Sequence, residues 1–123
     1  MEINSLGELM AVRTLELFSP DGAEIGAVII KIGKPVDIEM GTSYCPYQIS
    51  GIGEEKLHYG MGGDGVQALI IALTKIGTDL YTSAEWQTGR LTWMGDTSGN
   101  LGMPVIAEAF SEVVPAVSMN LTI

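Results

Sequence analysis

The sequence contains one cysteine, one histidine and six basic residues, and each of these small numbers excludes a kind of site. A single cysteine cannot form a disulfide within the chain, which fits a reducing compartment. A transition-metal site built on one histidine and one cysteine would need carboxylates to complete it, and the acidic residues lack any metal-binding spacing. We therefore expect neither a metal nor another cofactor.

Basic residues are also too few for a nucleic-acid surface. Six Lys and Arg stand against fifteen Asp and Glu, so the formal net charge is −9. Proteins that follow a phosphate backbone need clustered cations, which this chain cannot supply. The acidic surface suits instead a basic partner protein, because opposite charges speed the encounter and reject wrong partners.

Long hydrophobic runs are missing as well. The longest, residues 68–73, is much shorter than the ~20 residues of a membrane-spanning helix. Residues 1–8 have neither the basic region nor the apolar run of a secretory signal. Hydrophobic residues nevertheless make up 46% of the 123 residues, which is enough to build one core. We expect one cytoplasmic domain over residues 1–123, without a membrane segment.

A β-hairpin is predicted near the start of the chain. Residues 10–18 and 25–32 are rich in strand-forming side chains, and Ser-Pro-Asp-Gly at 19–22 is a strong turn sequence. The second run is almost continuously apolar, which is typical of a strand central in its sheet. Pro35 ends it, because proline cannot donate to a strand ladder.

A second hairpin is predicted from residues 44–49 and 56–61, which flank a glycine-rich acidic turn. The sequence leaves its register open, because a strand can slip by one or more residues when the turn is undefined. A short loop would place Cys45 opposite His58. A longer loop would place Ile49 there.

The clearest predicted element is a helix over residues 64–81. Asp64 is followed three positions later by Gln67, the spacing of a helix N-cap and its reciprocal partner. Gly77 costs about 1 kcal/mol of helix propensity relative to alanine, which indicates close approach of another backbone. One helical stripe carries Val66, Leu69, Ile70, Leu73, Ile76 and Leu80, and Ala68, Ile71 and Ala72 widen it. A helix this apolar is expected to be covered on more than one side, by the sheet and by a partner subunit if the sheet does not wrap it.

Beyond the helix the pattern predicts shorter elements. Residues 90–94 are a strand candidate, residues 105–113 a short helix, and residues 117–123 a strand that would close the sheet. The predicted fold is therefore α+β: a mainly antiparallel sheet of five to six strands with one principal helix packed on one face.

Three segments carry a resemblance to a known group of proteins. They are Ile-Gly-Lys-Pro at 32–35, Cys-Pro-Tyr-Gln-Ile-Ser-Gly at 45–51, and the helix start Asp-Gly-Val-Gln-Ala-Leu at 64–69. The chain resembles a family of small uncharacterised bacterial domains with an IGxP turn, a C-x-Y-x-I-x-G strand and a D-x-x-Q-A-L helix. The resemblance covers about residues 10–104 and leaves 105–123 as an extension. It implies a shared fold, and no activity or ligand comes with it.

Residues 60–65 spell G-x-G-x-x-G between a predicted strand and a predicted helix, and Glu85 follows twenty residues later. In a dinucleotide-binding protein this arrangement holds a pyrophosphate at the helix N-terminus and a ribose on the acid. Here Asp64 already caps the helix and would repel a phosphate. No parallel β-α-β pattern surrounds the motif, so we interpret the glycines as a tight strand-to-helix turn.

One nucleophilic arrangement can be assembled from the unique residues. Cys45 and His58 are the only members of a Cys–His pair, but an activated thiolate needs cations beside it and none is near in sequence. Ser43 or Ser50 with His58 and Asp64 would supply the residue types of a serine triad, but the sequence contains no nucleophile elbow to position the serine. We expect no catalytic residues.

Aromatic residues make up only 7% of the chain, yet most of them gather in two stretches. Such side chains are common anchors of protein interfaces, although ordinary packing explains them as well. The predicted anchors are Tyr44, Tyr47, Tyr59, Trp86 and Trp93, with Glu54, Glu55 and Asp96 on the polar rim.

These observations favour a non-enzymatic protein–protein interaction domain of a bacterium or phage, such as an immunity protein or an inhibitor of a toxin or defence system. One alternative is a small-molecule or nucleotide binder, or a minor enzyme, that uses the turn at residues 60–64 and His58. Another alternative is a structural homodimer that associates through the helix or an edge strand.

Overall fold

The computed structural model describes residues 1–105. Its first hairpin consists of β1 (Leu9–Phe18) and β2 (Glu24–Gly33), which pair antiparallel as predicted. The turn between them is closed by a hydrogen bond from the Ser19 N–H to the Ala23 carbonyl, at 2.8 Å. Gly22 adopts a φ of 92°, a conformation that residues with a side chain rarely take.

The second hairpin consists of β4 (Thr42–Ser50) and β5 (Leu57–Gly62), and β3 (Val36–Glu39) lies on the other side of β4. Pro35 separates β2 from β3, and both strands pair with β4 along the same side. With β6 (Leu91–Thr92) beside β1, the strands form a six-stranded antiparallel sheet in the order β3-β4-β2-β1-β6, with β5 beside β4.

Both registers considered for the second hairpin are wrong. The structure pairs Tyr47 with His58 and Cys45 with Gly60, so neither Cys45 nor Ile49 lies opposite His58. The turn between Ser50 and Leu57 is longer than either predicted loop, and the Glu55 carboxylate helps to close it by accepting the Gly51 N–H at 3.2 Å. The sequence pattern alone does not contain this contact.

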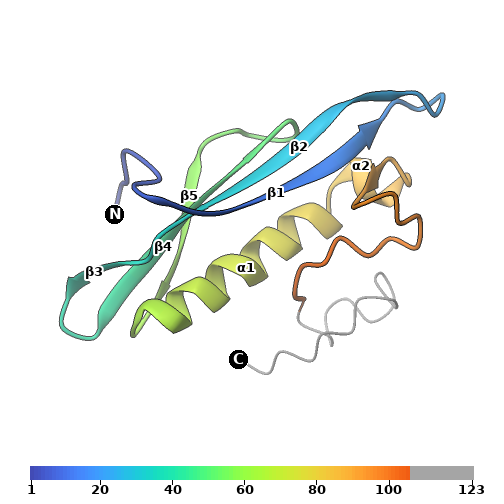
Figure 1. The fold of residues 1–123 in the computed structure, drawn as a ribbon. Coiled ribbons are helices and arrows are strands. Elements are labelled where there is room, and N and C mark those ends of the chain that lie inside the picture. Colours follow the sequence, from blue (N-terminus) through green and yellow to red (C-terminus); the bar gives the residue numbers. More distant parts are fainter. Residues whose placement is uncertain (106–123) are drawn as a thin grey trace.

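The main helix α1 (Gly65–Tyr81) lies along one face of the sheet (Figure 1). Asp64 is its N-cap, as predicted, and accepts the Gln67 N–H at 2.8 Å. The Gln67 amide oxygen accepts the Gly63 N–H at 2.6 Å and so reaches one residue before the cap. A short helix α2 (Ala84–Gln87) follows directly and is capped by Ser83.

The glycines before α1 let strand and helix approach closely. A Cβ at Gly60 would lie 2.7 Å from the Ala68 carbonyl oxygen and closer still to the Ala72 nitrogen, and a Cβ at Gly62 would lie 2.7 Å from the Ala68 nitrogen. Small residues on both surfaces therefore allow backbone-to-backbone contact between β5 and α1. Gly77 serves the same purpose at its own level, as predicted, because a Cβ there would overlap the Pro104 carbonyl.

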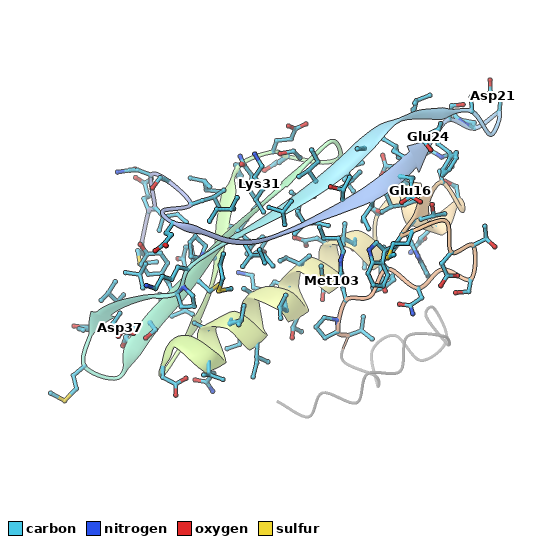
Figure 2. The ribbon with its side chains drawn as sticks, in the orientation of Figure 1. Glu16, Asp21, Glu24, Lys31, Asp37 and Met103 are labelled. Atoms are coloured by element: carbon cyan, nitrogen blue, oxygen red, sulfur yellow. The ribbon has the colours of Figure 1, made fainter. Side chains whose placement is uncertain are left out.

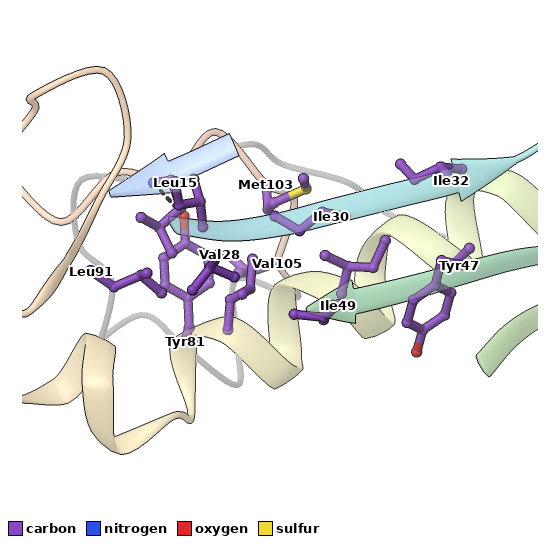
Figure 3. Packing of buried hydrophobic residues seen from close by; sticks show 14 of the residues in the cluster. Leu15, Val28, Ile30, Ile32, Tyr47, Ile49, Tyr81, Leu91, Met103 and Val105 are labelled. Atoms are coloured by element: carbon purple, nitrogen blue, oxygen red, sulfur yellow. Dashed lines mark hydrogen bonds between the residues drawn. The ribbon is translucent and has the colours of Figure 1, made fainter. Parts of the chain in front are cut away.

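The core lies between the sheet and α1 (Figure 3). The helix face that it buries runs along Ala68, Ala72, Ile76 and Leu80. Ile76 and Leu80 of the predicted stripe are therefore buried as expected, whereas Val66, where that stripe begins, is 68% exposed. The larger side chains were expected to mark the buried face. The close approach to β5 reverses this expectation near the helix start, since only alanine fits there.

A second apolar face of α1 is only half-covered within residues 1–105. Leu69, Ile70 and Leu73 are partly exposed there, although Leu69 and Leu73 also pack against the core. That this face is covered by a partner subunit stays a prediction.

The observed fold confirms the predicted α+β class, with a six-stranded antiparallel sheet and one main helix. The strand expected over residues 90–94 is present as β6, which is shorter. The helix expected from residue 105 to 113 falls outside the described residues except for its first, and the strand expected at 117–123 lies wholly outside them. Among residues 1–105, no helix has the length and apolar character needed to cross a membrane.

Candidate functional site

A cavity of about 360 Å³ opens between the turn of the second hairpin and the end of α1. Strand β4, strand β5 and the α1–α2 junction all contribute to its walls. The lining residues are Ile49, Ile52, Gly53, Glu54, His58, Asp79, Ser83 and Glu85. The only histidine of the chain thus shares one cavity with three carboxylates.

The two isoleucines give the cavity an apolar part, and His58 gives it a flat wall. The imidazole stacks on the Tyr47 ring with centroids 5.6 Å apart and planes 21° from parallel. Tyr47 is completely buried, and its hydroxyl has no hydrogen-bond partner among residues 1–105. Burial is the main cause that raises the Tyr47 pKa, and the negative charge of Asp79 adds to it. The Tyr47 phenol is therefore neutral at physiological pH.

The three carboxylates differ in how they are neutralised. Glu54 forms an exposed ion pair with Lys56 at 3.0 Å, and this contact lowers the Glu54 pKa. Within residues 1–105, neither Asp79 nor Glu85 has a basic side chain within 4 Å. The acidic groups surround the cavity without converging: no three of the His, Cys, Asp or Glu side chains described here are placed to hold a metal ion.

Local chemistry fixes the helical side of the cavity. The Ser83 hydroxyl donates to the Leu80 carbonyl at 2.6 Å and accepts the Trp86 N–H at 3.1 Å. One side chain thereby ends α1 and starts α2. This junction holds Asp79 and Glu85 on the same side as the hairpin turn.

That His58 and Asp79 line the same cavity follows from the rise of a strand and of a helix. His58 lies five residues before Gly63, about 17 Å along a strand, and Asp79 lies fifteen residues after Asp64, about 22 Å along a returning helix. A tight turn at residues 63–64 therefore brings both residues to a similar level. This relation was available from the sequence, yet Asp79, Ser83 and the apolar lining residues were not predicted as site residues.

The other end of α1 has a different cavity, of about 410 Å³, beside Gly63. Three carboxylates line it, those of Asp37, Glu39 and Asp64, where a dinucleotide would place its phosphates. Gly60 and Gly62 face the helix backbone, so these glycines serve packing. His58 lines the cavity at the far end of the helix, so the Gly60–Asp64 turn and His58 do not form one groove.

Cys45 and His58 do not form a catalytic pair. Cys45 is fully buried and lies opposite Gly60, and its thiol donates to the Gly33 carbonyl at 3.4 Å. Burial raises the Cys45 pKa to about 11, so the thiolate needed for nucleophilic attack is absent near neutral pH. The Ser43 hydroxyl donates a hydrogen bond to the Asp37 carboxylate at 2.5 Å and so does not face His58.

The five predicted aromatic anchors do not gather on one surface. Tyr44 and Tyr59 meet edge to face at 6.2 Å, whereas Tyr47 is completely buried and cannot reach a partner in this structure. The Trp86 indole N–H donates to the Gly99 carbonyl at 2.9 Å, and its ring packs against Tyr81. Trp93 carries the Arg13 guanidinium 4.0 Å above its ring. Both tryptophans are half-buried and engaged in internal contacts.

The predicted acidic rim is also divided. Glu54 lines the cavity, and Glu55 closes the hairpin turn next to it. Asp96 lies in the loop after β6, where its carboxylate accepts the Ser98 N–H at 2.8 Å. Hydrogen bonds from the side chain and then the backbone of Ser98 lower the Asp96 pKa. Of the predicted interface residues, only Glu54 lines the cavity itself.

Comparison with known proteins supports the predicted resemblance in its general form. The profile of one protein family matches residues 11–105, close to the span expected from the motifs. No protein with a curated description and no solved structure matches the chain. The match covers most of the chain, and the chain therefore belongs to the family described as a domain of unknown function, DUF6968.

Proposed function

We propose that this domain binds a basic partner protein and that the cavity beside His58 receives a lysine or arginine side chain of that partner. The observation that carries this proposal is the composition of the cavity. Ile49 and Ile52 offer apolar contact to an aliphatic stem, while Asp79 and Glu85 offer negative charge to the cationic end. A long basic side chain has this combination of properties.

The internal use of the basic residues supports the proposal. All six Lys and Arg lie within residues 1–105, and two of them form ion pairs, Lys34 with Glu8 at 3.8 Å and Lys56 with Glu54 at 3.0 Å. Three others, Arg13, Lys75 and Arg90, donate to main-chain oxygens instead. Most carboxylates are thus left for an external cation.

The biological role that fits best is the masking of a partner surface, as an immunity protein or an inhibitor does. An acidic domain of this kind steers a basic partner toward itself over long range, and the association weakens as salt screens the charges. This role requires no catalytic group, and the only cysteine is protonated and buried.

A second candidate is a small cationic metabolite that occupies the same cavity. The cavity volume of about 360 Å³ favours it, because ligand pockets start at roughly 300 Å³. Both candidates, the partner protein and the metabolite, would present a cationic group to the same cavity. They differ in the size of the molecule that carries this group.

The test is a titration of the full chain with two probes at low and at high salt. The first probe is Nα-acetyl-lysine N-methylamide, whose side-chain amine keeps its charge. The second is a ten-residue peptide that carries one lysine between polar residues. For a surface-masking domain we expect the peptide to bind at least about tenfold more tightly than the amide, with affinity lost at high salt. Equal affinities would favour the metabolite, and no binding of either probe would contradict both candidates.

The matched variants are Asp79→Asn with Glu85→Gln, and Asp21→Asn with Glu24→Gln. Both pairs remove two negative charges, but Asp21 and Glu24 lie at the tip of the first hairpin (Figure 2), and neither lines the cavity. We expect the first pair to weaken binding about fivefold or more and the second to leave it within about twofold. Equal losses would mean that net charge alone drives the binding.

A further inference from the structure

The first half of β1 has a free edge within residues 1–105. Strand β6 pairs only with Glu16 and Leu17 of β1, and the Phe18 N–H donates to the Arg90 carbonyl on the same side at 2.8 Å. Because backbone groups of an antiparallel strand alternate in direction, those of Val12 and Thr14 point to this side as well. No described strand lies beside them, so within residues 1–105 they form an unpaired sheet edge.

An apolar groove of about 380 Å³ accompanies this edge. Ile70 and Leu73, from the half-covered face of α1, form one wall, and Met103 and Pro104 contribute to it. On the strand itself Val12 is 52% exposed.

Among residues 1–105, no negatively charged side chain lines the groove. None of its lining residues is acidic, although the chain as a whole has a net charge of −9. Its single charged residue is Arg13, whose guanidinium donates to the carbonyls of Leu101 and Gly102 at 3.1 and 2.8 Å. This face can therefore meet another acidic surface without bringing carboxylates together.

We propose that a second copy of this chain pairs with the free edge, so that the two β1 strands join two sheets across a twofold axis. Antiparallel pairing requires edge-directed residues to face each other, and a register centred on Val12 meets this condition. It places Val12 opposite Val12 and Ala11 opposite Arg13 of the second copy. A register centred on Thr14 is excluded, because it would collide with the pairing of Glu16 to β6.

The geometry also explains the half-covered face of α1. In a twofold pair of this kind both helices lie on the same side of the joined sheet, so the two grooves adjoin. Ile70 and Leu73 of one copy then approach the same residues of the other, which buries apolar surface that the described part of one chain leaves exposed. No lining residue is shared with the acidic cavity, so both surfaces can be occupied at once.

Sedimentation of the full chain tests the proposal. We expect a dimer at micromolar concentration that becomes tighter as salt screens the repulsion between two acidic copies, opposite to the salt effect on a basic partner. Val12→Lys places a charge on the edge and should weaken the dimer about tenfold or more. Ile25→Lys is the control, because Ile25 is exposed to a similar degree, 59% against 52% for Val12, and lies on β2 and not in the groove.

Val12→Pro gives a second, independent disruption. Proline removes the N–H that points to the edge and leaves the ladder to β2 intact, because Val12 donates away from β2. Circular dichroism of each variant verifies that it folds. A monomer at all concentrations would overturn the proposal, and so would a dimer that Val12→Lys and Ile25→Lys weaken equally. Slow amide exchange at Val12 in a monomer would show that the same chain covers the edge, which also overturns it.

Discussion

The two ends of α1 meet β5 in different ways. Near the start of the helix, Gly60 and Gly62 let the strand backbone touch the helix backbone, and no side chain separates them. Near the end of the helix, His58 and Asp79 stand apart across a cavity. The same strand–helix pair is thus closed at one end and open at the other, because side-chain size changes along it.

The difference shows how a glycine motif and a binding cavity are related in this fold. The motif that resembles a phosphate-binding loop performs packing, and the space for a ligand lies farther back along the strand, beside His58, where the side chains are larger. In this arrangement the closed end positions the helix and the open end offers the chemistry.

Filling the closed end is expected to have the largest effect. Gly60→Ala introduces a Cβ that overlaps backbone atoms of Ala68 and Ala72, and backbone cannot rotate away as a side chain can. We expect a loss of about 3 kcal/mol or more in the free energy of unfolding, measured by urea denaturation. The control is Gly26→Ala, on β2, where a Cβ meets nothing within 4 Å and the cost should stay below about 0.5 kcal/mol. Equal losses would contradict the closed-end account.

Removing the helix cap is expected to have the next largest effect. Asp64→Ala deletes the carboxylate that accepts the Gln67 N–H and should cost about 1 kcal/mol in the free energy of unfolding. Asp64→Asn retains an oxygen acceptor and should restore most of that stability. If alanine stabilised the fold, Asp64 would instead be a residue kept for a ligand at a cost in stability.

The free energy of unfolding at alkaline pH shows how completely water is excluded from the Cys45 thiol, which lies opposite Gly60 at the closed end. Burial raises the Cys45 pKa to about 11, so between about pH 9 and pH 11 the folded chain keeps a proton that the unfolded chain has lost. The folded state therefore binds more protons in this window, and stability must fall as pH rises through it. We expect the fall to be shallower in Cys45→Ala, with the remainder caused by Tyr47 and Tyr81, whose pKa values burial also raises. The same slope in both proteins would mean that water reaches the thiol.

The smallest effect is expected at the wall between the two ends. The Tyr47 hydroxyl is buried and has no hydrogen-bond partner in the described part of the chain, so Tyr47→Phe removes a group that is desolvated without compensation. We expect thermal unfolding to show an unchanged or slightly raised melting temperature. A loss of more than about 1 kcal/mol would indicate that the hydroxyl is bridged through the cavity to a group such as Asp79.

How much of this was predictable follows from the range of each interaction. The helix, its cap at Asp64, the first hairpin and the close contact at Gly77 depend on neighbours in sequence or on one residue type, and the sequence predicts them. The Tyr47–His58 register and the position of the buried helix face do not follow from local pattern. Both depend on which strand the small residues of α1 contact, and hydrophobicity ranks Ala68 below Leu69 although only alanine fits against Gly60 and Gly62.

The cavity could be predicted only in part. Glu54 was predicted as part of an acidic rim, but Asp79 looked like one charged residue at the end of an apolar helix. Its partnership with His58 depends on a tight turn that returns the helix along β5, and that turn becomes certain only when the glycines are known to face the helix. That the predicted aromatic residues anchor an interface stays a prediction. The sequence could not show how they are placed, because aromatic composition does not distinguish a buried ring such as that of Tyr47 from an exposed one.

The most direct test of the open end is a site-resolved NMR titration of the full chain with Nα-acetyl-lysine N-methylamide. We expect the amide resonances of Ile52, His58 and Ser83 to shift together while that of Gly63 stays unchanged. In the Asp79→Asn, Glu85→Gln double variant we expect these shifts to disappear. Shifts centred on Gly63, or shifts spread evenly over all acidic residues, would contradict it.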